Sequence, residues 1–286
     1  MPKLTSVTAL FPAYNDAGTI PSMVIMAFKA LPLVTDDYEV VVVNDGSQDY
    51  TAEVLAELAG LYPRLRVITH PRNRGYGAAL RTGFSQASKD WIFYTDGDAQ
   101  YDPHELVQLA AALRDDVDIV NGYKISRSDP PHRVIIGRLY HYLVKWVFGL
   151  PLRDTDCDFR LFRRGLFERV TLESDSGTIA LELVKKFHDA GARFVEVPVH
   201  HYHRAYGQSQ FFNFRRLVRT AVQLSQLWWK LVARPLSVQR TQRAQPVPPP
   251  ASGAAGDQHP APSGSAHGGA VPAAARADGR DQADTL

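Results

Sequence analysis

Residues 38–49, YEVVVVNDGSQD, place four consecutive valines ahead of a turn-forming Asp-Gly-Ser sequence. Valine is β-branched and favours strands, and a continuous apolar run is typical of a strand covered on both faces. The residues that follow, 51–61, have helical spacing. This stretch therefore predicts a buried strand, a turn and a helix, which is the repeating unit of a parallel α/β sheet.

The same alternation continues on both sides of this stretch. Further strands are predicted at Val7–Phe11, Arg66–Thr69, Trp91–Thr95, Asp118–Gly122, near Phe159 and at Arg193–Pro198. Further helices are predicted at Thr19–Leu31, Gly77–Ala87, from Pro103 onward, at about Val134–Phe148 and at Thr178–Ala190. Alternating patterns of this kind are typical of a mostly parallel sheet flanked by helices. We therefore expect an α/β fold.

Composition limits the function classes. The chain has 286 residues, of which 45% are hydrophobic, enough for one large domain or two small ones. The formal net charge of +2 is too small to give the whole protein a positive electrostatic field that would attract nucleic acid, so we expect no nucleic-acid partner. The single cysteine, Cys157, excludes internal disulfides and Cys-rich zinc sites, and favours a cytosolic location. We expect no secretory signal, and no apolar run reaches the roughly 18 residues of a membrane span.

The C-terminal part of the chain differs in composition from the rest. Ala, Pro and Gly supply 25 of the 43 residues from Ala244 to Leu286, and nothing aromatic follows Trp229. Such a segment cannot bury enough apolar surface to offset the entropy of ordering it. We therefore expect residues 240–286 to be disordered, residues 213–239 to form an amphipathic helix, and residues 1–212 to form the α/β domain.

Ligands of open α/β sheets bind beyond the carboxyl ends of the strands, so the residues after each strand are the candidates. The first strand is followed by PAYND at 12–16, which has no G-x-G-x-x-G pattern, and this argues against a dinucleotide cofactor. After the second strand, Asp45 begins a turn whose carboxylate can bind a ribose or a base edge. The alternative is that this turn caps the helix that follows it.

The sequence DGDAQYDP, residues 96–103, carries the strongest chemical signal. Asp96 and Asp98 are two residues apart beyond a strand and point the same way, and Gln100 adds an amide oxygen. Together they offer a hard divalent cation part of an oxygen shell. An EF-hand calcium loop is excluded because Tyr101 and Val107 stand where Gly and Glu are required. The alternative is a solvated acidic turn that caps the next helix.

Six motifs occur in order along the chain. They are PAYND at 12–16, VNDGSQD at 43–49, NRGYGAALRTG at 73–83, DGDAQYDP at 96–103, RDTDCDFRLFRR at 153–164 and VPVHHYHRAYGQSQF at 197–211. On these motifs the chain resembles the family 2 glycosyltransferases, and within them the dolichyl-phosphate mannose synthase and polyprenyl-phosphate glycosyltransferase branch, over about Val7 to Phe212. The resemblance implies a GT-A fold, a nucleotide-sugar donor, a divalent metal such as Mg²⁺ or Mn²⁺, and inversion at the sugar carbon.

The resemblance also assigns roles on the donor side. The matched donor-binding positions are Pro12, Tyr14, Asp16, Asp45, Gly75, Gly77, Asp96 and Ser209. In the family, Glu is commoner than Asp at position 16, and the two glycines let the backbone approach the donor, with a helix-entry turn as the alternative. Asp98 and Gln100 match the metal ligands, and Arg204 matches the arginine of a lid over the donor diphosphate. Asp98 and Arg204 are thereby implied to be catalytic.

On the acceptor side, Arg127 and Arg133 match the arginines that bind the lipid phosphate, and the alternative is that they are solvated on a loop. The branch usually has Ser-Gly where this chain has Cys157 and Asp158, so the acceptor stays open. A hydroxyl acceptor would need a base, and Asp156 is the candidate catalytic residue for that role. Cys157 is interpreted as a packing residue, because inverting transfer forms no covalent enzyme intermediate.

The C-terminal region of the domain is basic. No acidic residue occurs from Val197 to Gly256, and apolar and basic residues are interspersed in the amphipathic helix predicted at 213–239. A helix of this kind can lie on an anionic membrane, and packing on the domain itself is the alternative. His200, His201 and His203 do not indicate zinc, since neighbouring residues diverge on an extended chain and no fourth ligand is evident.

The sequence therefore predicts an inverting, metal-dependent transfer of a hexose, mannose or glucose, from a nucleotide-sugar to a polyprenyl phosphate. The predicted site of action is the cytoplasmic face of a membrane. Three alternatives remain: transfer to a hydroxyl acceptor, a sugar-1-phosphate nucleotidyltransferase, and a non-catalytic sugar-nucleotide-binding protein.

Overall fold

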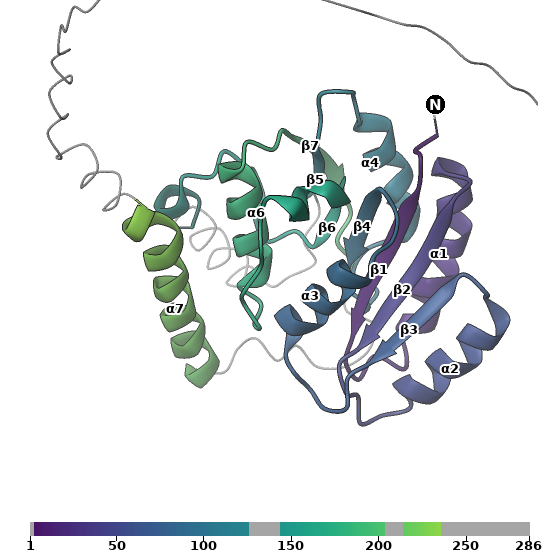
Figure 1. Cartoon of the computed structure of the whole chain (residues 1–286). Helices are drawn as coiled ribbons and strands as arrows, with labels where there is room; N and C mark the ends of the chain where they lie inside the picture. The colour runs from purple at the N-terminus through teal and green to yellow at the C-terminus, as the bar shows by residue number, and fades with distance from the viewer. Residues whose placement is uncertain (1–2, 126–143, 204–213, 236–286) are drawn as a thin grey trace, which may run out of the picture. The chain divides into compact units, whose positions relative to one another are not determined.

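The computed structural model describes residues 3–125, 144–203 and 214–235 (Figure 1). Its centre is a seven-stranded sheet in the order β3-β2-β1-β4-β6-β5-β7. The strands are β1 (Val7–Ala13), β2 (Tyr38–Asn44), β3 (Leu65–Thr69), β4 (Trp91–Thr95), β5 (Ile119–Lys124), β6 (Phe159–Arg163) and β7 (Phe194–Val199). Only β6 runs antiparallel to its neighbours, β4 and β5. The predicted mostly parallel α/β sheet is confirmed.

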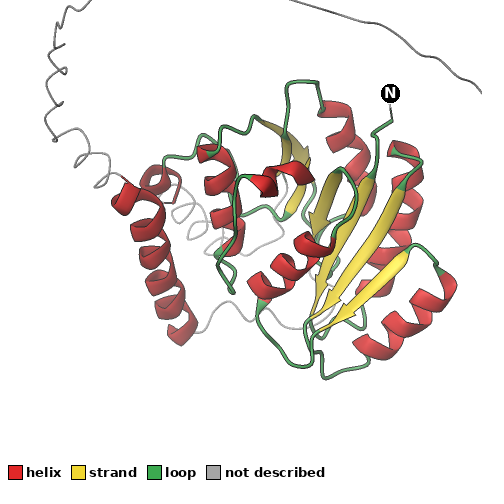
Figure 2. Cartoon of the chain, in the orientation of Figure 1, coloured by secondary structure: helices red, strands yellow, loops and turns green. Residues whose placement is uncertain are grey.

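Helices cover the sheet on both faces (Figure 2). The helices that the structure describes are α1 (Ile20–Val34), α2 (Thr51–Leu61), α3 (Tyr76–Gln86), α4 (Leu106–Ala112), α6 (Ile179–Asp189) and α7 (Phe214–Trp228), of which α7 lies to the side of the sheet (Figure 2). Short 3₁₀ segments lie at Pro103–Glu105 and Arg164–Glu168, and a π-helical turn, Trp229–Ala233, extends α7. Residues 144–148 are helical, and the earlier part of the helix predicted at 134–148 lies outside the described residues.

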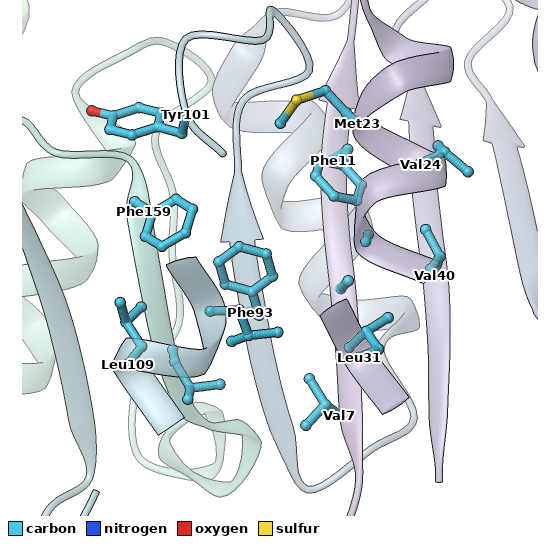
Figure 3. Packing of buried hydrophobic residues seen from close by; sticks show 14 of the residues in the cluster. Val7, Phe11, Met23, Val24, Leu31, Val40, Phe93, Tyr101, Leu109 and Phe159 are labelled. Atoms are coloured by element: carbon cyan, nitrogen blue, oxygen red, sulfur yellow. The ribbon is translucent and has the colours of Figure 1, made fainter. Parts of the chain in front are cut away.

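The four valines of β2 divide between two cores. Val40 and Val42 pack in the core formed with α1, α2 and α4, whereas Val41 and Val43 pack in the core formed with α3 and α6. The alternation follows from the two-residue period of a strand. Figure 3 shows the first core, where Phe11 of β1 lies beside the helix α1. The prediction that this strand is covered on both faces is confirmed.

Most predicted boundaries agree with the structure, and two differ in an informative way. The first strand was predicted to end at Phe11, but Pro12 and Ala13 still pair with Val43 and Asn44 of β2. The first motif therefore begins inside the sheet. Helix α1 continues past the predicted end at Leu31 to Val34, with Pro32 in its last turn.

Candidate functional site

The loops that follow β1, β2 and β4 meet at the carboxyl edge of the sheet, since these three strands are parallel and adjacent. Because β6 is antiparallel to β4, the residues that precede β6 reach the same edge. Four of the six sequence motifs therefore converge there although they span more than 140 residues of chain, from Pro12 to Phe159.

The first two motifs form one hydrogen-bonded unit. The backbone N–H of Asn15 donates to Ser47 Oγ at 3.0 Å, and the N–H of Gln48 donates to Asn15 Oδ1 at 2.8 Å. Asn15 has a φ of 56°, a left-handed conformation that costs energy in a non-glycine residue. The Asp16 carboxylate accepts the N–H of Tyr14 at 2.9 Å, and the Tyr14 side chain remains 42% exposed. These contacts hold the loop after β1 in a defined shape at the edge of the sheet.

The carboxylate of Asp45 binds the backbone of the loop that precedes α3. Its Oδ1 accepts the N–H of Arg74 at 2.9 Å and lies 2.6 Å from His70 Nδ1, and its Oδ2 accepts the N–H of Gly75 at 2.8 Å. Gly75 is the N-cap residue of α3, so the buried Asp45 stabilises the start of α3 and not the start of α2. The sequence patterns of 43–49 and 73–83 are thus physically linked by one carboxylate.

The glycines of the third motif are explained by close backbone contacts. Gly75 has a φ of 98°, and a Cβ there would lie 2.4 Å from the carbonyl oxygen of Asp175. A Cβ on Gly77 would lie 2.3 Å from the carbonyl oxygen of Ser174. The space beside both glycines is filled by the backbone of residues 174–175. These contacts fit the alternative interpretation, in which the glycines serve the entry into the helix.

The fourth motif places Asp96, Asp98 and Gln100 on one loop at the site. Asp98 is 6% exposed and its Oδ1 accepts the N–H of Gln100 at 3.0 Å. Between them Ala99 adopts a φ of 60°. The Gln100 amide nitrogen donates to the Tyr202 carbonyl at 3.2 Å, and the Tyr202 N–H donates to the Gln100 carbonyl at 2.8 Å. The loop is thereby joined to the segment that follows β7.

Asp96 lies in an acidic surrounding. Its Oδ1 accepts the hydroxyl of Tyr76 at 2.7 Å. Burial raises the pKa of Asp96 well above its ordinary value, and the carboxylates of Asp158, Asp98 and Asp16 raise it further. Negative charge is thus concentrated at this edge, and a cationic ligand would relieve it.

The oxygen atoms of Asp98 and Gln100 are suitable ligands for a hard divalent cation. In the part of the chain that the structure describes, no group of three or more His, Cys, Asp or Glu side chains is arranged to hold a metal ion. Mg²⁺ commonly binds proteins through only one or two carboxylates, with the remaining oxygens supplied by water and substrate phosphates. The Asp98 carboxylate and the Gln100 amide oxygen are protein ligands of the type that Mg²⁺ uses.

The segment before β6 contains a carboxyl group with an altered pKa. Burial raises the pKa of Asp156 to about 6, against the opposing charge of Lys124. The Lys124 ammonium donates to the backbone carbonyl of Asp156 at 2.8 Å. Cys157 is completely buried, and burial raises the pKa of its thiol to about 12, so it has the environment of a packing residue.

Sequence reasoning missed a buried arginine beside this segment. Arg160 is fully buried, donates to Asn121 Oδ1 at 2.6 Å and to the Thr155 carbonyl at 2.7 Å, and also donates to the Tyr94 hydroxyl. Its Nη1 lies 3.7 Å from Asp158 Oδ1. The residue stands within the fifth motif, but a single arginine in a strand of alternating polarity resembles a solvated one, and only the strand pairing reveals its burial.

Several predicted residues lie outside the described part of the chain. These are Arg127 and Arg133 of the acceptor loop, and Arg204 and Ser209 of the lid. Of the three histidines, His200 is paired with Glu105, with its Nδ1 2.5 Å from Glu105 Oε1, and His201 packs edge-on against Tyr101.

Helix α7 has two kinds of surface. Leu227 is buried in the second core, with Leu224 and Leu231 packed against it. Val218, Val222 and Trp229 are exposed, and Trp229 is 63% exposed. Both interpretations of this segment are thus compatible with the structure, since one side of α7 packs on the domain and other residues face outward. No described helix has the length and apolarity to cross a membrane.

The model of Glycosyl transferase family 2 matches residues 8–171, which is more than half of the chain. The chain belongs to glycosyl transferase family 2. The family predicted from the six motifs is therefore confirmed.

Two relatives carry the same name, undecaprenyl-phosphate 4-deoxy-4-formamido-L-arabinose transferase. The protein of Yersinia enterocolitica is 30% identical over 211 residues, covering 73% of this chain and 63% of the relative. That of Enterobacter sp. is 30% identical over 214 residues, covering 74% of this chain and 64% of the relative. The chain thus spans less than two thirds of the length of these relatives.

Among solved structures, glucosyl-3-phosphoglycerate synthase from Mycobacterium tuberculosis, in complex with Mn²⁺, uridine diphosphate and phosphoglyceric acid, matches with a TM-score of 0.60. The match covers 79% of this chain and 78% of that chain at 18% identity, so it bears on the fold alone. With the sheet order described above, it confirms the predicted GT-A fold.

Proposed function

We propose that this chain is an inverting, metal-dependent glycosyltransferase that moves a sugar from a nucleotide-sugar to a polyprenyl phosphate. The observation that carries the proposal is the convergence of Asp16, Asp96 and Asp98 at the carboxyl edge of the sheet in a family 2 chain. The names of the two relatives, which include undecaprenyl phosphate as acceptor, support the acceptor class.

On the donor side, the loops after β1 and β4 bind the nucleotide-sugar. The exposed ring of Tyr14 is available to a base, and Asp16 shapes the loop that carries it. Asp98 and Gln100 would hold Mg²⁺ or Mn²⁺, which supplies positive charge to the diphosphate as the leaving group departs. Asp45 supports the site indirectly, since it fixes the loop 74–75 that precedes α3. Arg204 and Ser209 are proposed to close over the diphosphate.

On the acceptor side, a phosphate oxygen attacks the anomeric carbon of the sugar. The bond between that carbon and the diphosphate breaks, its electron pair leaves with the nucleoside diphosphate, and the configuration inverts. A phosphate monoester is already ionised at neutral pH, so this reaction needs no strong base. Arg127 and Arg133 are proposed to bind the acceptor phosphate, because guanidinium groups match phosphate oxygens in pairs.

The polyprenyl acceptor places the reaction at a membrane, and we propose that α7 contacts the cytoplasmic leaflet. Val218, Val222 and Trp229 are exposed at spacings of four and eleven residues, which brings them to one side of a helix. Arg219 and Arg234 are basic residues of the same segment and favour an anionic surface, whereas the Lys230 ammonium donates to Glu173 Oε2 at 3.0 Å. Trp suits the headgroup boundary of the membrane.

One observation favours a second candidate, a hydroxyl acceptor. A hydroxyl must lose its proton as it attacks, and the catalytic base works best when its pKa is near the working pH. The pKa of about 6 places Asp156 in that range. The transferred sugar is also open: the relatives are named for a substituted arabinose, whereas the motifs predict mannose or glucose.

The test is a donor panel of UDP-sugars and GDP-sugars, including UDP-glucose and GDP-mannose. Each donor is incubated with undecaprenyl phosphate in vesicles or with soluble hydroxyl acceptors, in Mg²⁺ or Mn²⁺, with and without EDTA. The proposal expects release of nucleoside diphosphate and a glycosylated lipid, both abolished by EDTA. Release of pyrophosphate would identify a nucleotidyltransferase, and binding without any product would identify a sugar-nucleotide-binding protein; either result contradicts the proposal.

A further inference from the structure

Asp158 stands opposite Asp96 at the edge of the sheet. In the antiparallel pairing of β4 and β6, Tyr94 pairs with Arg160 and Thr95 pairs with Phe159. The next pair in that register is Asp96 with Asp158. Side chains in such positions have Cβ atoms about 5 Å apart, and like charges there destabilise the fold. A second carboxylate therefore faces the loop of the fourth motif.

Contacts with Tyr94 and Arg160 hold the Asp158 carboxylate in place. Its Oδ1 accepts the Tyr94 hydroxyl at 3.1 Å and lies 3.7 Å from Arg160 Nη1. Arg160 is itself held by Asn121 and by the carbonyl of Thr155, so the guanidinium has little freedom. Charge-assisted contacts of this kind keep a carboxylate in one orientation.

The other oxygen of Asp158 is available to a ligand. The Asp158 side chain is 22% exposed, and within the described residues its Oδ2 makes no hydrogen bond. A rigid, partly exposed carboxylate oxygen is a preorganised hydrogen-bond acceptor. It lies at the edge where the donor loops meet.

The charge of Asp158 indicates which kind of ligand its second oxygen binds. The negative charge of Asp158 disfavours direct contact with the donor diphosphate or with an acceptor phosphate, whereas its second oxygen can accept an O–H group of a neutral sugar. We propose that Asp158 accepts a hydrogen bond from a hydroxyl group of the transferred sugar and so contributes to the choice of donor. This inference rests on the proposed function.

The experiment compares the binding of nucleoside diphosphate with that of nucleotide-sugar. Wild type, Asp158→Asn, Asp158→Gly and the surface control Asp116→Asn are titrated calorimetrically with UDP, GDP and the sugar panel in Mg²⁺. Asp116 is exposed and pairs only with the exposed Arg193 among the described residues, so its loss should leave binding unchanged. Circular dichroism and thermal unfolding of each variant verify that it is folded.

The expected result is selective. Both Asp158 variants bind the nucleoside diphosphate within twofold of wild type, but bind the preferred nucleotide-sugar roughly 10-fold to 100-fold more weakly, as expected for one hydrogen bond to a charged group. Equal weakening of both ligands would assign Asp158 to the cation or nucleotide and overturn the inference, as would no change in either. If wild type binds no nucleotide-sugar of the panel, the proposed function itself fails, and this outcome is separate from the other two.

Discussion

Replacing Gly77 by Ala tests the interpretation that the third motif serves contact with the protein's own backbone. The new Cβ would lie 2.3 Å from the Ser174 carbonyl oxygen and 2.7 Å from the Asp175 carbonyl carbon. Both are backbone atoms, so relief requires α3 and residues 174–175 to separate. That movement also strains the hydrogen bond from the Gly77 N–H to the Asp175 carbonyl, which is 3.0 Å long.

The expected cost follows from these contacts. Overpacking of this kind costs about 1–3 kcal/mol, and a weakened hydrogen bond adds about 1 kcal/mol. Ala is favoured over Gly in a helix by about 1 kcal/mol, which offsets part of the loss. The net decrease in the free energy of unfolding is therefore about 2 kcal/mol. For a domain of this size that corresponds to a fall in Tm of roughly 4–8 °C.

The matched control is Gly60→Ala in α2. Gly60 is also helical, but it is exposed and a Cβ there meets nothing within 4 Å. This variant should be more stable than wild type by about 0.5–1 kcal/mol, because only the helix preference acts. Both are measured by calorimetry and urea unfolding. An unchanged Tm for Gly77→Ala, or equal loss in both variants, refutes the assignment of Gly77 to backbone contact.

Three further predictions concern the site and the membrane. Asp98→Ala should lower kcat by roughly 10²–10³ in Mg²⁺ or Mn²⁺, as expected for loss of one electrophilic contact; unaltered turnover contradicts its role. Because the folded pKa of Asp156 is raised to about 6, this carboxyl group should lower the stability of wild type as the pH rises from about 4 to 6. In thermal scans the Tm of Asp156→Asn minus that of wild type should thus be larger at pH 7.5 than at pH 4, and a constant difference argues against the shift. Trp229→Ser should reduce sedimentation with phosphatidylglycerol vesicles, whereas Leu61→Ser, which removes an even more exposed apolar side chain from α2, should not. Sedimentation that is insensitive to salt would contradict the electrostatic part of the contact.

Local chemistry explains why so much of the fold was predictable. Secondary-structure preference depends on residues that are close in the chain, such as the four valines of β2, the alternating apolar and helical patterns and the turn residues. The order of the elements and the burial of the sheet on both faces follow from these local patterns. The six motifs indicated the family for the same reason, since each is a short contiguous segment.

The partners of each side chain depended on contacts between distant segments. Asp45 was assigned to the donor or to the turn beside it, yet its oxygens bind the N–H groups of Arg74 and Gly75, which only the packing of α3 brings near. The insertion of β6 between β4 and β5 placed Asp158 opposite Asp96 and buried Arg160. Sequence alone therefore determined which elements form and which motifs they carry, because these depend on local preference and periodicity. The tertiary structure decided which charges face one another, because strand order and register are properties of the assembled sheet.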